Sequence, residues 1–200
     1  KLGPSTWERE PFIKDHDGSP FTFQPSVYTT GLEGIPSERN TFIGYWQTEK
    51  YFDEKLVREK IQFRYPLSNQ SLRVAEQIAK AGKGGTFLHV RRGADYKRSD
   101  HHSLASMRYY NEVVQRVREN YEGAKFFVFG DDPIWMREQF SRPEFVIVDH
   151  IEPDTNGVHE DMHLMSLCYN AAIATSSFAW WSAWLGSTQP DRLIFAPDTW

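Results

Sequence analysis

The feature that most restricts the fold is a regular alternation of short apolar runs with amphipathic stretches, from residue 86 to the end of the chain. The apolar runs predict strands at 86–91, 125–132, 145–149, 171–175 and 193–196. Helical spacing predicts helices between them, at 106–121, 135–140, 161–170 and 177–185. Such alternation is typical of an α/β fold whose parallel sheet carries helices on both faces, and we expect a Rossmann-like, doubly wound sheet.

The N-terminal part of the chain has a different character. Up to about residue 40 it is rich in Pro, Gly, Ser and Asp and shows no sustained period, which predicts loop with one short strand. Residues 41–46 are strand-like, 51–61 have helical spacing, and a helix over 71–81 is stopped by a cluster of glycines. We therefore expect a loop-rich and helical segment, 1–75, packing on a main domain, 76–200.

Composition excludes several classes of function. The 200 residues, 40% hydrophobic, suffice for one sizeable core, and a net charge of -4 argues against a nucleic-acid-binding protein. The single cysteine, Cys168, cannot form an intramolecular disulfide, and no Cys/His cluster has the spacing of a structural zinc site. The acidic runs 15–17 and 131–132 lack supporting ligands, so we expect no required metal. No apolar stretch reaches the length of a membrane span.

Polar residues follow the predicted strands at the edge where doubly wound sheets bind ligands. They are Arg91, Arg92, Asp131, Asp132, Asp149, Ser176 and Ser177. Two adjacent arginines after a buried strand suit bidentate phosphate binding, because a guanidinium is costly to bury unpaired. The alternative for the arginine pair is a salt bridge to Asp95. We favour an anion site, because serine and aspartate pairs follow neighbouring strands.

The aspartate and serine pairs each have a structural alternative. The carboxylates of Asp131 and Asp132 can accept hydrogen bonds from ribose hydroxyls or from a base edge, whereas Asp132 can also cap the helix that begins at Pro133. Ser176 and Ser177, with the amides that follow, would face an anion at the positive end of a helix, or would simply cap it.

The tryptophan cluster and the histidine pair are less strongly indicated as binding residues. The three tryptophans between 180 and 184 lie at helical spacing, which favours a core stripe over a sugar platform. His101 and His102 lie in a charged loop and are either solvated or part of an acceptor site.

Four segments together resemble the alpha-1,2-fucosyltransferases, glycosyltransferase family 11. They are His89-Val-Arg-Arg-Gly, Phe127-Val-Phe-Gly-Asp-Asp-Pro-Ile-Trp, Asp161-Met-His-Leu-Met-Ser-Leu-Cys and Ser177-Phe-Ala-Trp-Trp-Ser-Ala-Trp-Leu. An upstream segment, Gly44-Tyr-Trp-Gln-Thr-Glu-Lys-Tyr-Phe, is also similar to that family, so the resemblance spans roughly 44–200 in the family's order. The family's opening Gly-rich strand and turn is not found before Lys1, and we expect an N-terminally shortened member.

The resemblance implies an inverting, metal-independent transfer of L-fucose from GDP-fucose to a galactoside hydroxyl, on the nucleotide-binding half of a GT-B fold. The donor and a glycan acceptor are then the expected partners, with no cofactor. Arg91 is expected to bind the β-phosphate, with Arg92 beside it and His89 near the nucleoside. The remaining roles are guanine binding by Asp161, nucleoside contacts from Asp131 or Asp132, and a phosphate cradle from Ser176, Ser177 and the Phe178 amide.

Departures from the family's pattern keep two alternatives open. Ala94 separates Gly93 from Asp95 and so moves this aspartate by one residue relative to the family's pattern. Asp95, Asp100 and His102 lie in the same loop, and we name Asp95 as the general base. The alternatives are a non-catalytic module that binds a GDP-sugar or a glycan, and a transferase that uses another GDP-sugar. Membrane association is expected only through a segment before Lys1, and the location is expected to be cytoplasmic in a microbe or virus and the Golgi lumen in a eukaryote.

Overall fold

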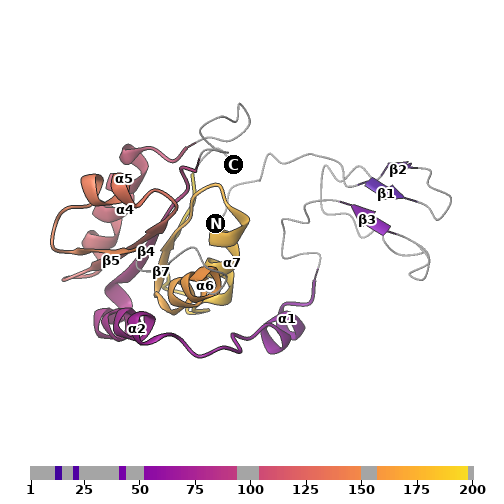
Figure 1. Cartoon of the computed structure of the whole chain (residues 1–200), viewed down its shortest axis with the longest axis horizontal. Coiled ribbons are helices and arrows are strands. Elements are labelled where there is room, and N and C mark those ends of the chain that lie inside the picture. Colours follow the sequence, from indigo (N-terminus) through magenta and orange to yellow (C-terminus); the bar gives the residue numbers. More distant parts are fainter. Residues whose placement is uncertain are drawn as a thin grey trace. The chain divides into compact units, whose positions relative to one another are not determined.

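The computed structural model describes residues 52–93, 104–149 and 157–197, together with the course of three short strands nearer the N-terminus (Figure 1). The chain divides into two compact units, residues 1–62 and 63–200. This division falls before helix α2 (Asn69–Ala81), whereas the sequence placed it after residue 75. Val74 and Ile78 of that helix are buried in the core of the second unit, which explains why the helix belongs there.

In the first unit, the structure describes three strands of three residues each and one helix. Strands β1 (Phe12–Lys14), β2 (Pro20–Thr22) and β3 (Thr41–Ile43) form an antiparallel sheet in the order β2-β1-β3. The sequence predicted the strand at 41 but only one before residue 40, because three-residue strands are too short to give a periodic pattern. Helix α1 (Glu54–Lys60) begins after Asp53, whose carboxylate accepts a hydrogen bond from the Leu56 amide at 2.8 Å.

The second unit is built on a five-stranded sheet whose strands are all parallel, which confirms the predicted α/β fold class. Its strands are β4 (Gly85–Val90), β5 (Lys125–Gly130), β6 (Phe145–Val148), β7 (Asn170–Ala172) and β8 (Ile194–Phe195). Their spatial order is β6-β5-β4-β7-β8. The chain thus starts at the centre, builds outward to one edge, and then returns to build toward the other.

Each connection between consecutive strands of this sheet contains a helix. The connecting helices are α4 (Met107–Asn120), α5 (Pro133–Gln139), α6 (Gly157–Leu167) and α7 (Ser177–Leu185). Helix α6 starts four residues before the predicted residue 161 and ends before Asn170, which is the first residue of β7. The Asn170 side chain donates to the Lys83 carbonyl at 2.8 Å and accepts from the Leu193 amide at 3.0 Å. These bonds favour the strand over a longer helix.

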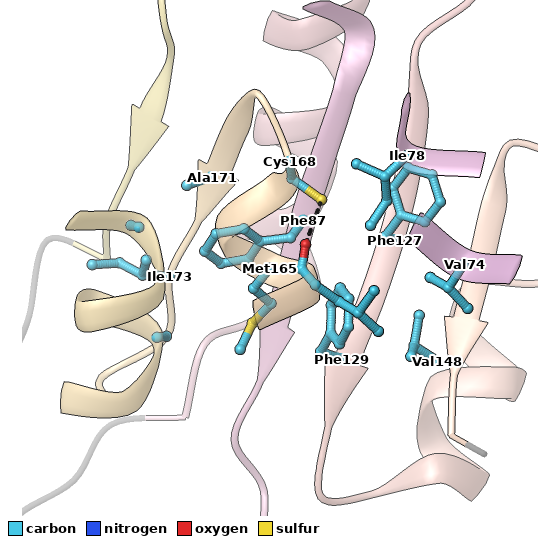
Figure 2. Close-up of a cluster of buried hydrophobic side chains, with 13 residues drawn as sticks. Val74, Ile78, Phe87, Phe127, Phe129, Val148, Met165, Cys168, Ala171 and Ile173 are labelled. Atoms are coloured by element: carbon cyan, nitrogen blue, oxygen red, sulfur yellow. Dashed lines mark hydrogen bonds between the residues drawn. The ribbon is translucent and has the colours of Figure 1, made fainter. Parts of the chain in front are cut away.

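The core lies in two layers, one on each face of the sheet, because successive strand residues point to opposite faces. One layer joins Phe87, Phe127 and Phe129 to helices α2, α6 and α7 (Figure 2). The other layer joins the intervening strand residues, among them Leu88 and Val128, to helices α4 and α5. Helices therefore cover both faces, as the apolar strand runs predicted.

Cys168 is fully buried in the first of these layers and its thiol donates to the Leu164 carbonyl at 3.7 Å (Figure 2). Burial raises the pKa of this thiol well above its usual range, so it remains protonated and serves as a small apolar core residue. In the part of the chain that the structure describes, no helix has both the length and the apolar character needed to cross a membrane.

Candidate functional site

The order of the strands marks one position where a ligand is expected. Strands β4 and β7 are neighbours, but the chain leaves them toward opposite edges of the sheet. Their parallel ladder is short and ends at the pair Leu88 and Ala172. In open α/β sheets, ligands bind outside the carboxyl ends of the strands where the strand order reverses. The candidate site therefore comprises the residues that follow β4 and β7.

Arg91 follows β4 directly, and its partner in the structure is Asp131 after β5. The guanidinium Nη1 of Arg91 donates to the Asp131 carboxylate at 2.5 Å. The same carboxylate accepts from the main-chain amides of Arg92 at 2.6 Å and Gly93 at 3.0 Å. The sequence expected Arg91 and Asp131 at one edge but did not predict that they pair. Asp95, the partner considered from the sequence, lies outside the described residues.

Arg92 points toward the start of helix α5, where it contacts Asp132 and Trp135. Its Nε lies 3.9 Å from an Asp132 carboxylate oxygen, and its guanidinium carbon lies 4.2 Å from the centroid of the Trp135 ring. Asp132 also accepts from the Trp135 amide at 3.2 Å and so caps α5, as the structural alternative predicted. Stacking on an aromatic ring holds the arginine through its planar face.

His89 is the second-last residue of β4 and points to the same face of the sheet as Phe87. Its side chain is buried, its ring centroid lies 6.0 Å from that of Phe178, and Nδ1 has no hydrogen-bond partner among the described residues. Burial lowers the pKa of His89 to about 4. The imidazole is therefore neutral at pH 7 and can offer a hydrogen bond, not a charge, to a ligand.

The contact between His89 and Phe178 brings the start of helix α7 next to the end of β4. Ser176 is the N-cap residue of α7, yet in the described structure its hydroxyl makes no capping hydrogen bond. In α2 and α4 the corresponding serines, Ser68 and Ser106, do cap their helices. The simple capping alternative therefore fails for Ser176, and Ser177 is exposed beside it. A helix start whose N-cap hydroxyl does not cap its own amides suits an anion.

Asp161 lies in the second turn of α6, the helix packed against α7. One of its carboxylate oxygens, Oδ1, is buried without a hydrogen-bond partner among the residues described. Burial, followed by the charge of Glu160, raises the pKa of Asp161 to about 7. A buried carboxyl group with an unused acceptor is available to a ligand that offers N–H donors.

The sequence His159-Glu-Asp-Met-His163 on α6 has the spacing of a zinc-binding helix, a motif that the sequence analysis overlooked. The structure uses these residues differently. The His163 ring stacks on Phe63 with centroids 4.3 Å apart, and the Glu160 carboxylate is bound by Ser68 and by Ser71. Within the described ranges, no group of three ligating side chains could hold a metal ion.

Several predicted residues contribute less or cannot be placed. The carboxylate of Asp149, after β6, is bound by Arg137 of α5. Trp180, Trp181 and Trp184 are all half-buried and contact one another, and Trp180 also packs against the core. Asp95, Asp100, His101 and His102 all lie outside the described residues, so the general base stays a prediction.

Fold and site together define a class: an α/β protein with a doubly wound sheet, whose candidate site holds Arg91, Ser176 and a buried neutral histidine at the carboxyl ends of the central strands. The sequence profile of glycosyl transferase family 11 matches residues 10–200. The chain belongs to this family, as the resemblance predicted.

Two curated proteins of Escherichia coli are similar in sequence. One is an alpha-1,2-colitosyltransferase, 34% identical over 188 residues, a match that covers 89% of this chain and 62% of the relative. The other is the O-antigen biosynthesis glycosyltransferase WbnK, 31% identical over 134 residues, covering 64% of this chain and 43% of that protein. The chain thus spans less than two thirds of the length of either relative.

Among solved structures, POFUT1 in complex with GDP-fucose aligns with 66% of this chain and 47% of its own, at 17% sequence identity and a TM-score of 0.43. The apo form of POFUT1 aligns over the same shares at 16% identity and a TM-score of 0.42.

Proposed function

We propose that this chain carries the donor site of a glycosyltransferase that moves L-fucose from GDP-fucose to a galactoside hydroxyl, forming an alpha-1,2 linkage with inversion. The proposal depends on one observation above all. Arg91 and the start of α7, whose N-cap Ser176 makes no capping hydrogen bond in the described structure, follow the two strands that flank the reversal of strand order. Membership of glycosyl transferase family 11 supports the reaction class.

The chemistry of the site suits the departure of a nucleoside diphosphate. In an inverting transfer, the acceptor oxygen bonds to the anomeric carbon as the bond from that carbon to the β-phosphate oxygen breaks. Negative charge then grows on the β-phosphate, and a fixed arginine stabilises this charge more in the transition state than in the ground state. We assign this role to Arg91, with amides at the start of α7 as further donors.

The donor's other groups fit the remaining predicted residues. The buried carboxyl group of Asp161 would accept N–H donors of the guanine edge, and neutral His89 would lie near the nucleoside. Asp95 would take the proton from the acceptor hydroxyl. No metal is needed in this scheme, because an arginine supplies the positive charge at the phosphate.

Arg91→Lys tests the proposal, because lysine keeps the charge but loses the planar fork. We expect transfer in the intact protein to fall at least about tenfold. Arg108→Lys is a matched control, since Arg108 is exposed on α4 and pairs only with Glu112 in the described structure. Unchanged turnover of the Arg91 variant would refute the assignment.

Two further measurements examine the general base and the metal. Asp95→Asn should abolish transfer while GDP-fucose still binds, and normal transfer would eliminate Asp95 as the base. Transfer should also survive EDTA. Activity that EDTA removes and Mn²⁺ restores would overturn metal independence.

The second candidate function is the same kind of transfer with a donor sugar other than fucose. It is favoured by the relative that transfers colitose in alpha-1,2 linkage and that matches 89% of this chain. Incubation with GDP-fucose, another GDP-sugar and nucleotide-activated colitose, followed by mass spectrometry of the product, identifies the donor. Calorimetry separates the non-catalytic alternative, which predicts GDP binding with neither hydrolysis nor transfer of any sugar.

A further inference from the structure

Asp131 is the first residue after β5, and its carboxylate is the meeting point of three donors from the turn after β4. The guanidinium Nη1 of Arg91 donates to Oδ2 at 2.5 Å, and the amide of Gly93 donates to the same oxygen at 3.0 Å. The amide of Arg92 donates to Oδ1 at 2.6 Å. One side chain thus binds both the arginine side chain and the backbone of the turn that carries it.

The approach of β5 to β4 at this point is close, and it depends on Gly130. A Cβ atom on Gly130 would lie 2.3 Å from the main-chain oxygen of Val90, a distance that backbone atoms cannot relieve by rotating. The Asp131 amide donates to that same oxygen at 3.3 Å. The backbone therefore delivers Asp131 to the turn in a fixed position.

The neighbouring carboxylate has a different task. Asp132 faces the start of α5, where it caps the helix and lies 3.9 Å from Arg92. The Asp131 carboxylate, by contrast, pairs with the Arg91 guanidinium. The two aspartates, which the sequence treated as equivalent nucleoside contacts, are thus separated by the structure.

We propose that Asp131 is a positioning residue, which fixes the Arg91 guanidinium and the Arg92–Gly93 turn in the geometry that receives the diphosphate. This inference rests on the proposed function. A guanidinium carries five N–H donors, so an arginine can be held by a carboxylate and bind a phosphate at the same time. Two successive backbone amides that already point at one carboxylate also keep the turn from rearranging.

Three roles for Asp131 predict different results with three probes: GDP, inorganic pyrophosphate and guanosine. A positioning residue acts through the phosphate, so Asp131→Asn should weaken GDP and pyrophosphate binding and leave guanosine binding unchanged. A nucleoside contact would weaken GDP and guanosine and spare pyrophosphate. A carboxylate that merely occupies an empty phosphate site would compete with the ligand, and its removal would tighten GDP and pyrophosphate binding.

The experiment is calorimetry of the intact protein with these probes. We expect Asp131→Asn to weaken GDP binding about tenfold, because a guanidinium that loses its charge-assisted hydrogen bond to a carboxylate is no longer held in place. Asp191→Asn is the matched control, since its exposed carboxylate also binds a cation, Lys83. That control should bind GDP normally. If Asp131→Asn does not fold, Asp131→Glu, which retains the charge, is compared on the same probes.

A double-mutant cycle with Arg91→Lys shows whether Asp131 acts through the arginine. If it does, Asp131→Asn should add less than about threefold to the loss already caused by Arg91→Lys. Independent losses, tighter binding, or a loss confined to guanosine would overturn the positioning role. The proposed function fails separately, when Arg91→Lys leaves both GDP binding and transfer unchanged.

Discussion

The hydroxyl group of Tyr110 donates a 2.8 Å hydrogen bond to the main-chain oxygen of His89, the second-last residue of β4. The adjacent Tyr109 donates in the same way to the main-chain oxygen of Ile173, at 2.9 Å. The ladder between β4 and β7 ends one residue earlier on each strand. Two neighbouring side chains of α4 therefore bind the strands just beyond the point where their main-chain pairing stops.

Tyr110→Phe should destabilise the protein and weaken GDP binding. Burial raises the pKa of Tyr110 well above its usual range, so the hydroxyl is a permanent donor, and its loss leaves a buried carbonyl without that partner. The expected cost is about 1–3 kcal/mol of unfolding free energy, measured by urea titration. GDP binding, measured by calorimetry, should fall several-fold because Arg91 follows two residues after the released carbonyl.

The control for this change is Tyr121→Phe. Its hydroxyl also donates to a main-chain oxygen, that of Asp191 at 2.9 Å, but at an exposed position away from the end of β4. Tyr121→Phe should lower the free energy of unfolding by much less than Tyr110→Phe does, and it should leave GDP binding unchanged. Equal effects of the two variants would contradict a special role for the α4 tyrosines.

Gly130→Ser should disturb the site more than its small size suggests. The added Cβ would meet the Val90 oxygen at 2.3 Å and the Val90 Cβ at 2.7 Å, so the end of β5 must shift. Such overpacking typically costs about 1–3 kcal/mol. Because Asp131 is the next residue, we expect the affinity for GDP to fall together with the free energy of unfolding.

Gly82→Asn serves as the comparison for the glycine change. Gly82 has φ +53 and ψ -132, a backbone conformation that residues other than glycine rarely adopt, and the space around its Cβ position is open. We expect the substitution to lower stability through backbone strain and to leave GDP binding unchanged. A stable Gly130 variant with normal GDP affinity would show that the ends of β4 and β5 can move apart without affecting the candidate site.

The sequence predicted the fold well where burial is continuous. Every residue of β4 is buried, and a short apolar run that follows glycines is typical of a central strand between two layers of helices. Boundaries were less accurate, as at α6, because the apolar residues of this helix give a weak periodic signal. Local capping was also predictable, since Asp132 lies three residues before the amide that it binds.

Contacts between distant residues could not be predicted in the same way. Arg91 and Asp131 are 40 residues apart, and no spacing rule relates them. The sequence placed both at one sheet edge, because the ends of parallel strands meet there, but pairing depends on the side-chain geometry. The tyrosine hydroxyls of α4 were missed for a related reason, since the helical pattern identified Tyr110 only as a core-facing residue.

The stability of the protein should depend on the ionisation of Asp161. Burial raises the pKa of Asp161 to about 7, above the value of 3.8 for an ordinary aspartate. Between these values the folded chain holds a proton that the unfolded chain has released. The contribution of the protonated Asp161 carboxyl to stability is therefore greatest below about pH 4 and is lost as the pH rises to about 7.

Asp161→Asn should remove this dependence, so that urea unfolding at several pH values between 4 and 8 shows a flatter profile than the parent protein. If Asp161 also binds the guanine edge as a carboxylate, guanosine affinity in the parent should rise between pH 6 and 8. An unchanged slope of stability with pH in the variant would show that the Asp161 carboxyl titrates normally.

Glu160, which the sequence left unassigned, joins α6 to the start of α2 and should be among the most sensitive residues of the second unit. Its carboxylate accepts from the Ser68 amide at 3.1 Å, from the Ser68 hydroxyl at 2.8 Å, and from the Ser71 hydroxyl. Burial raises the pKa of Glu160, but the serine hydrogen bonds outweigh burial and hold that pKa below its ordinary value.

Because the folded pKa of Glu160 is lowered, its stabilising effect is present above about pH 4.5 and is lost as the pH falls through the folded pKa. Glu160→Gln replaces one accepting oxygen by a donor that faces serine donors, and we expect a loss of about 1–3 kcal/mol in urea unfolding at pH 7. Glu112→Gln, at an exposed position of α4, should change stability by less than about 0.5 kcal/mol. A Glu160 variant as stable as this control would mean that apolar packing of α2, through residues such as Val74 and Ile78, holds the helix in place without the Glu160 hydrogen bonds.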